Sequence, residues 1–158
     1  MSASITFGML AGTPGAGHAS EELIELSQDD RQWVMPAKNY ASTRYSGLDE
    51  IHRGNVAELE VAWTFSTGTT AGFEAAPLVV GDTLYIVAPF PNRLHALDIR
   101  DGATRWVYAP QPERAAQGVA CCDVVNRGAA YFDGNIYFNT LDNRTIAVDA
   151  ETGEQVWE

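Results

Sequence analysis

The sequence predicts an all-β fold made of four-stranded antiparallel blades of a β-propeller, and three observations carry this prediction. A pattern repeats along the chain: Trp106 and Trp157 lie 51 residues apart, as do Asp98 and Asp149. Each cycle of this repeat holds about four short strands with tight turns between them. Each cycle also places a tryptophan near its last strand. A period near 50 residues with four strands per unit is typical of a propeller blade.

The two cycles match each other in their strands and turns. The strand core Leu84-Tyr85-Ile86 of the first cycle recurs as Ile136-Tyr137-Phe138 in the second. Tight turns are expected at four pairs that contain glycine, which accepts backbone conformations that other residues avoid. These pairs are Gly81-Asp82, Asp101-Gly102, Asp133-Gly134 and Thr152-Gly153. Because tryptophan is large and mostly apolar, we expect a packing role between sheets for Trp63, Trp106 and Trp157.

Residues 1–20 are interpreted as a leader that does not belong to the fold. They contain an apolar patch around Phe7 and Leu10, followed by Gly17-His18-Ala19 as a small-x-small cleavage pattern. The basic segment that opens a secretory signal is missing, so a signal remnant and an unstructured leader both stay open. The sequence lacks an apolar run near the roughly 20 residues that a bilayer-spanning helix needs, so membrane insertion is not expected.

Residues 21–58 are interpreted as an N-terminal lead-in with short helices. The run Ser27-Gln28-Asp29-Asp30 is typical of a helix cap with acidic residues in the first turn, and the helix would end before Pro36. Asn55 is expected to cap a second short helix through Leu59.

Residues 59–158 are interpreted as a partial β-propeller, consisting of a closing strand and about two blades. Val61, Trp63 and Phe65 alternate with smaller or polar residues, which is the pattern of a half-buried strand. Trp63 resembles the tryptophan of a last strand, yet the three preceding strands of its blade are missing. In a closed ring this N-terminal strand would complete the final blade and remove an exposed edge. The sequence therefore predicts a chain truncated at its C-terminus.

The charge balance excludes one class of partner. The formal net charge is −11 and the pI is near 4.5, whereas binding to nucleic-acid phosphates requires a basic surface. No nucleic-acid partner is expected. An acidic surface of this kind is either solvated or steers a basic protein toward the chain.

Cys121 and Cys122 are the only cysteines, and they are adjacent. Their Cα atoms are about 3.8 Å apart across a trans peptide, below the usual disulfide range of roughly 4.4–6.8 Å, so a bond between them would be strained. Three interpretations stay open: a pair of buried thiols, a metal or redox thiol site, and a disulfide platform beneath a ligand. Asp123, Asn126 and Arg127 place a carboxylate, an amide and a guanidinium beside the pair, which favours a local function.

Two other patterns carry less weight. Zinc is not expected at the cysteine pair, because a second pair is lacking and the histidines are scattered at His18, His52 and His95. Asn143-Arg144-Thr145 fits a glycosylation sequon, but so short a pattern recurs by chance.

The stretch from Ala120 to Gly128 resembles the vicinal-disulfide motif of the pyrroloquinoline quinone (PQQ) dependent methanol and ethanol dehydrogenases. This nine-residue motif is highly specific. The similarity runs from about Glu22 to Glu158 and includes three weaker motifs. These are Asn39-Tyr40-Ala41, Ala62-Trp63-Thr64-Phe65-Ser66-Thr67-Gly68 and Phe73-Glu74-Ala75-Ala76-Pro77.

The resemblance implies a site and a function. It implies that Cys121 and Cys122 form a disulfide that stacks on one face of PQQ, and that Glu74 and Arg127 bond to the cofactor's edge. It implies a periplasmic enzyme with an eight-bladed propeller that oxidises primary alcohols to aldehydes and passes electrons to a c-type cytochrome. In that family the catalytic base and the ligands of calcium or a lanthanide lie beyond position 158, so no catalytic or metal-binding residue is assigned here.

Two other functions are weighed against the quinoprotein. One is a non-catalytic propeller scaffold that binds protein partners, and the other is a thiol redox module. Because two blades leave strand edges and a sheet face uncovered, we also expect the isolated chain to associate with itself. We expect the isolated chain to lack alcohol-oxidising activity.

Overall fold

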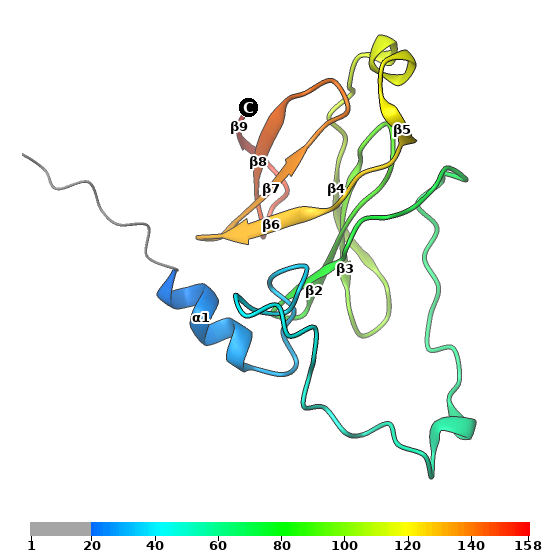
Figure 1. Cartoon of the computed structure of the whole chain (residues 1–158), viewed down its shortest axis with the longest axis vertical. Helices are drawn as coiled ribbons and strands as arrows, with labels where there is room; N and C mark the ends of the chain where they lie inside the picture. The colour runs from blue at the N-terminus through cyan, green and yellow to red at the C-terminus, as the bar shows by residue number, and fades with distance from the viewer. Residues whose placement is uncertain (1–19) are drawn as a thin grey trace, which may run out of the picture.

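The computed structural model of the chain describes residues 20–158, so the leader predicted for residues 1–20 lies, apart from Ser20, outside the described residues. Within the described part, no helix is long and apolar enough to cross a membrane. Most regular structure belongs to two four-stranded antiparallel sheets that lie next to each other (Figure 1). Two four-stranded blades were predicted, and this prediction is confirmed.

Each sheet is a meander in which consecutive strands pair. The first sheet has the order β1 (Leu78–Val80), β2 (Thr83–Val87), β3 (Leu94–Asp98) and β4 (Thr104–Tyr108). The second has the order β6 (Ala129–Phe132), β7 (Asn135–Asn139), β8 (Thr145–Asp149) and β9 (Gln155–Trp157).

The two sheets also share an irregularity in their strand pairing. The pairing of β3 with β4 shifts register between Ala96 and Leu97, and the pairing of β8 with β9 shifts between Ala147 and Val148. The irregularity therefore recurs at the same position in each sheet.

The hydrophobic core lies between the two sheets. Each strand alternates its side chains between two faces, so one apolar set of each sheet meets its neighbour. The Tyr85 hydroxyl spans this interface and donates a hydrogen bond of 2.9 Å to the carbonyl oxygen of Ala150. The buried residues that pack here are Leu78, Tyr85, Val87, Leu94, Ala96, Ile136, Phe138, Ile146 and Val148.

Two of the three tryptophans pack as predicted. The Trp106 ring lies against Gly153 of the second sheet, and its indole N–H donates a hydrogen bond of 3.1 Å to the carbonyl of Ala150. Trp63 contacts the first sheet in the same way, with its ring against Gly102 and its N–H 3.1 Å from the carbonyl of Ile99. Trp157 is 46% exposed, because none of the described residues form a third sheet beside it.

The first helix differs from the prediction. Helix α1 spans Glu21–Gln28, so it ends where the sequence predicted a helix to begin. Ser20 caps it by accepting a hydrogen bond of 3.4 Å from the Leu23 amide, and Glu21 and Glu22 place negative charge in its first turn. The backbone leaves the helix at Asp29, which pairs with Arg31 at 2.8 Å.

The lead-in is held against both sheets. Trp33 forms an antiparallel bridge with Val79 of β1. The Tyr131 hydroxyl of β6 donates a hydrogen bond of 2.7 Å to the Glu22 carboxylate of α1. Lys38 is buried, and its ammonium donates to the carbonyls of Asp29 and Gln32 at 2.6 and 2.8 Å.

The second short helix is present as one turn of 3-10 helix, η1, over Val56–Glu58. Asn55 precedes it but does not cap it. Its side chain instead accepts from the His52 amide at 2.8 Å and donates to the Glu50 carbonyl at 2.7 Å.

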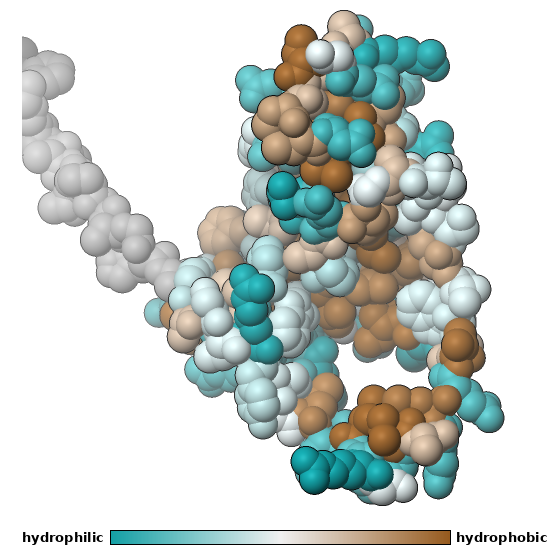
Figure 2. All heavy atoms as spheres, turned by 45° about the vertical axis from the view of Figure 1, so that its right-hand side comes forward, coloured by the Kyte–Doolittle hydropathy of each residue, from teal (hydrophilic) through white to brown (hydrophobic). Residues whose placement is uncertain are grey.

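The closing strand predicted from Val61 is not a strand in the structure, because the described chain offers it no neighbouring strand to pair with. The predicted alternation persists beyond Val61: Trp63 and Phe65 are half-buried, while Thr64 is exposed. The preceding segment carries exposed apolar side chains that gather at the bottom of the view in Figure 2. The exposed large apolar side chains of residues 48–59 are those of Leu48, Ile51, Val56 and Leu59.

Candidate cofactor-binding site

The predicted site lies on the connection between the two sheets. Residues 109–128, called here the bridging loop, run from the end of β4 to the start of β6. The loop contains the 3-10 helix η2 (Arg114–Gly118) and the short strand β5 (Cys121–Val124), which lies outside both four-stranded sheets. Figure 1 shows η2 and β5 at the same end of the molecule, beyond the ends of the sheets.

Cys121 and Cys122 are both exposed on β5, so their interpretation as buried thiols is wrong. Their sulfur atoms are 2.9 Å apart, and in the structure both cysteines are free and not disulfide-bonded. The hydrogen bond and the charge of Cys121 raise the pKa of the Cys122 thiol. Because a reactive thiol needs a lowered pKa, this environment does not favour a nucleophilic thiol.

Glu74 and Arg127 meet beside the cysteine pair, although they are far apart in the sequence. One guanidinium nitrogen of Arg127 lies 2.5 Å from a carboxylate oxygen of Glu74, and their side chains are 74% and 46% exposed. Arg127 therefore pairs with Glu74 and not with Asp123, which is nearer to it in the sequence. The charges of Arg127 and Glu74 act in opposite directions on the pKa of Cys122. The four predicted residues therefore share one exposed surface.

Gly128 makes this meeting possible. It forms an isolated parallel bridge with Ala76, two residues after Glu74. Its φ is +110°, and a Cβ atom there would lie 2.8 Å from the carbonyl oxygen of Ala76. Any larger residue would push the Glu74 segment away from Arg127.

Asn126 holds the end of the bridging loop through two side-chain hydrogen bonds. Its side-chain oxygen accepts from the Gly128 amide at 2.9 Å, and its side-chain nitrogen donates to the Asn139 carbonyl at 2.8 Å. Asp123 adopts a left-handed backbone with φ of +63°. The next residue, Val124, accepts a hydrogen bond of 2.9 Å from the Phe90 amide of the first sheet.

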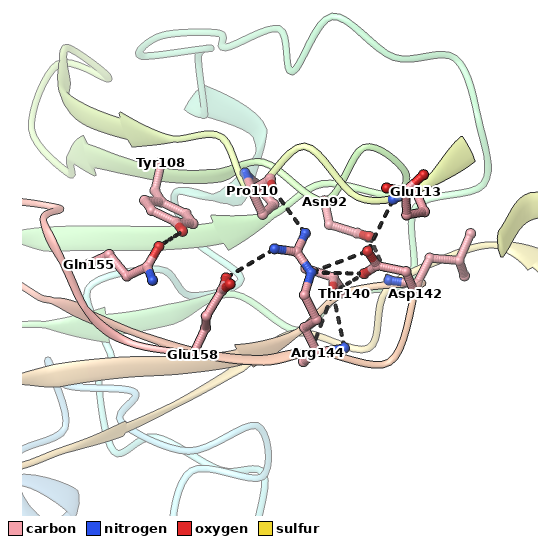
Figure 3. Close-up of polar contacts among 10 residues, drawn as sticks. Asn92, Tyr108, Pro110, Glu113, Thr140, Asp142, Arg144, Gln155 and Glu158 are labelled. Carbon is pink, nitrogen blue, oxygen red and sulfur yellow. Dashed lines mark hydrogen bonds and ion pairs between the residues drawn. The ribbon is translucent and has the colours of Figure 1, made fainter. Parts of the chain in front are cut away.

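Sequence reasoning missed a polar cluster that holds the start of the bridging loop (Figure 3). Arg144 donates from Nε to the Asp142 carboxylate at 3.1 Å and from one Nη to the Pro110 carbonyl at 2.9 Å. The Glu113 amide donates to Asp142 at 3.0 Å. The sequence did mark the position of this turn, because Asn143-Arg144 repeats Asn92-Arg93 at the same 51-residue spacing.

The ionisable groups of this cluster favour their charged forms. Burial pushes the pKa of Asp142 upward, but hydrogen bonds from Thr140, the Glu113 amide and Arg144 outweigh it and hold that pKa below its usual value. Burial likewise opposes the charge of Arg144, yet its contacts with Asp142 and Glu158 raise its pKa overall. Both groups are therefore charged at neutral pH.

A cavity of about 280 Å³ opens beside Arg127. Both polar side chains, including Asn126, Asn139, Thr140 and Asn143, and the apolar side chains of Val125 and Leu141 line it. In residues 20–158, no group of three or more histidine, cysteine, aspartate and glutamate side chains is arranged to hold a metal ion.

Comparisons with known proteins identify the family. Residues 33–158 match the family model described as "PQQ: Glucose/ethanol/alcohol dehydrogenase, beta-propeller domain". The chain is 48% identical to the lanthanide-dependent methanol dehydrogenase of Methylacidiphilum fumariolicum (strain SolV), over 96% of this chain and 25% of that protein. It is 47% identical to methanol dehydrogenase [cytochrome c] subunit 1 of Methylobacterium organophilum, over 95% and 26%.

A solved structure gives the same result. The fold matches a europium-containing methanol dehydrogenase with a TM-score of 0.84 and 50% identity, covering 87% of this chain and 24% of that one. The chain spans about a quarter of the length of the relatives that it matches.

Proposed function

Because the chain belongs to the family of PQQ glucose/ethanol/alcohol dehydrogenase β-propeller domains, we propose that it supplies one side of the cofactor site of a quinoprotein alcohol dehydrogenase. The whole protein would oxidise a primary alcohol such as methanol or ethanol to the aldehyde and pass the electrons to a c-type cytochrome. The relatives support this proposal, since their names include methanol dehydrogenase and cytochrome c.

The residues present fit the cofactor. PQQ is a planar quinone with three carboxylates, and when bound it supplies the capacity to accept two electrons. This surface offers an exposed cysteine pair for a flat contact, and the guanidinium of Arg127 held by Glu74 for an anionic edge. The meeting of Glu74 and Arg127 at 2.5 Å beside the cysteine pair is the observation that carries the proposal.

Arg127 would have two roles. Its guanidinium is a rigid fork of donors that suits carboxylate or quinone oxygens, so it would orient the cofactor. Its positive charge would also stabilise the negative charge that develops on a quinone oxygen during the reaction. Glu74 would hold the guanidinium in the required direction through their ion pair.

Cys121 and Cys122 would form a disulfide in the periplasm, because an oxidising compartment permits the bond. Their free sulfurs already lie side by side, 2.9 Å apart. The bond would enclose almost no chain, so it would contribute little to global stability and would serve the cofactor contact. A calcium or lanthanide ion would accompany PQQ, and two of the relatives are named for a lanthanide or for europium. We assign neither its ligands nor the catalytic base to the described residues.

The first testable prediction is that the 158-residue chain binds added PQQ and that Arg127→Gln weakens this binding at least about tenfold, because a charge-assisted contact is lost. Binding is measured from the absorbance change of PQQ. The matched control is Arg100→Gln, since Arg100 is 71% exposed and also pairs with one carboxylate, that of Asp98, at 2.6 Å.

Equal affinity of the Arg127→Gln and Arg100→Gln variants would contradict the proposed role of Arg127. Failure of the native chain to bind PQQ would instead favour the protein-binding scaffold. Titration of free thiols after mild oxidation tests the disulfide in the same samples, and two remaining thiols would contradict the proposed bond.

A further inference from the structure

We infer that Arg144 and Asp142 are positioning residues, which fix the bridging loop so that the cysteine pair faces the cofactor. That the cysteine pair faces a cofactor rests on the proposed function. That Arg144 and Asp142 fix the bridging loop rests on contacts within the chain. Neither residue belongs to the predicted site. Figure 3 shows that both side chains point toward the start of the bridging loop.

The start of the bridging loop is attached to this pair at two backbone groups. Arg144 donates to the Pro110 carbonyl at 2.9 Å, and Asp142 accepts from the Glu113 amide at 3.0 Å. Backbone groups of a loop need partners when they leave the sheet, and charged partners give the strongest hydrogen bonds. The pair therefore fixes residues 110–113, directly before η2 and the cysteines.

The end of the bridging loop is attached to the same turn of the second sheet. The Asn126 side chain donates to the carbonyl of Asn139, the last residue of β7. Residues 140–144 connect β7 to β8, so this turn, together with Asn139 at its start, holds the bridging loop on both sides of the cysteine pair. Moving the turn or releasing either contact would move Cys121 and Cys122 relative to Arg127.

The first sheet carries an arginine at the matching repeat position. Arg93 lies 51 residues before Arg144, but its turn is one residue longer: its carbonyl accepts from the Ala88 amide at 2.8 Å, five residues earlier, whereas the Arg144 carbonyl accepts from the Thr140 amide at 2.9 Å, four residues earlier. The Arg93 side chain is exposed and forms no ion pair within residues 20–158. The β2–β3 turn therefore closes without a bound arginine side chain, whereas in the β7–β8 turn the Arg144 side chain reaches the Pro110 carbonyl of the bridging loop.

Burial supports this assignment. The side chains of Arg144 and Asp142 are 30% and 12% exposed, so their ion pair is better shielded from water than the Arg127–Glu74 pair. A shielded pair that also satisfies backbone groups is expected to stabilise its contacts more than an exposed surface pair.

The second testable prediction compares Arg144→Gln and Asp142→Asn with Arg93→Gln. Amide hydrogen exchange, followed by mass spectrometry on the 158-residue chain, should become about tenfold faster over residues 111–124 in the first two variants. It should stay unchanged over β6 to β8, and Arg93→Gln should exchange like the native chain. Arg144→Lys should be intermediate, because one ammonium cannot reach Asp142, Glu158 and Pro110 together.

Unchanged exchange over residues 111–124 in both Asp142→Asn and Arg144→Gln would overturn the inference. Equal acceleration over the bridging loop and β6 to β8 would also overturn it, because it would indicate general destabilisation. If Arg144→Gln fails to fold, Asp142→Asn and Arg144→Lys provide the same comparison.

PQQ affinity is measured in parallel to separate the two proposals. The inference predicts that Arg144→Gln weakens PQQ binding several-fold while the bridging loop exchanges faster. A bridging loop that loosens in a chain whose native form does not bind PQQ would refute the proposed function and leave the positioning role intact.

Discussion

The two sheets have the same topology and the same register irregularity but differ in what covers them. The first sheet is covered on both faces, by the segment carrying Trp63 on one side and by the second sheet on the other. The second sheet is covered on one side only, and every residue of β9 is exposed. The comparison teaches that the strands of a blade pair within the blade, whereas the faces of its sheet are buried only by the neighbouring elements.

The covering segment replaces a blade without forming a sheet. Trp63 contacts Gly102 and Ile99 as Trp106 contacts Gly153 and Ala150. Phe65 adds an edge contact with His95, at 5.1 Å between ring centroids. Trp63 and Phe65, two residues apart, therefore both contact the first sheet from this segment.

The largest expected loss of stability comes from a substitution that breaks the contact between the two sheets. Trp106→Ala should lower the free energy of unfolding by about 3 kcal/mol, since it removes a large packed side chain and its hydrogen bond. Trp157→Ala should cost less than about 1 kcal/mol, because Trp157 contacts Tyr137 but none of the described residues 20–158 form a sheet beyond it. Both values are measured by denaturant unfolding. Equal losses would mean that burial by a neighbouring sheet is not what distinguishes the two tryptophans.

The second largest expected loss of stability comes from a substitution at Gly153, on which the Trp106 ring packs. A Cβ atom at Gly153 would lie 2.6 Å from the Trp106 ring, whereas a Cβ atom at Gly134 would meet no atom within 4 Å. Both glycines have positive φ, near +73°, so both alanine variants carry a similar backbone strain. We expect Gly153→Ala to be about 2 kcal/mol less stable than Gly134→Ala, because only Gly153 adds a clash with a rigid ring.

The same denaturant unfolding experiment measures this difference. In the double variant Gly153→Ala/Trp106→Ala the clash disappears, so the extra cost of Gly153→Ala should shrink. Persistence of the full cost without the ring would show that backbone strain alone explains it.

The repeating parts of the fold could be predicted from the sequence, and the parts that depend on single distant contacts could not. Turns at Gly102 and Gly153 and the packing of Trp106 follow from local residue types that occur twice. The Arg144 contact with Pro110 could not be predicted, because a backbone carbonyl carries no residue signature. The strand predicted from Val61 was wrong because a strand needs a partner as well as an alternating pattern.

The residues of the candidate site also differ in how far the sequence could predict them. The cysteine pair drew attention by its sequence alone, since two adjacent thiols are unusual. Glu74 and Arg127 were selected through the family resemblance, and only the structure shows that Gly128 lets their segments approach. The start of α1 was missed although Ser20 followed by two glutamates is a normal capping signal.

The smallest expected effect concerns one position at which the two sheets differ in chemistry. His95 on β3 corresponds to Ile146 on β8, and both side chains are buried. The two ring nitrogens of His95 have no hydrogen-bond partner among the described residues. Leaving a buried polar group unpaired is costly, so His95→Ile should raise the free energy of unfolding by about 1 kcal/mol at neutral pH.

His95 should also make the stability of the first sheet depend on pH. Burial lowers the pKa of His95, and the positive charge of Arg93 lowers it further. Below about pH 6.5, the ordinary histidine pKa, the unfolded chain binds a proton that the folded chain does not. Stability should therefore fall as the pH decreases through 6.5 and should level off above about pH 7. Denaturant midpoints between pH 5 and pH 8 measure this slope, which His95→Ile should reduce and His52→Gln, at an exposed histidine, should leave unchanged. An equal slope in the native and His95→Ile chains would mean that the imidazole is protonated in the folded state, and the covering segment would then have to accommodate a charge beside Phe65.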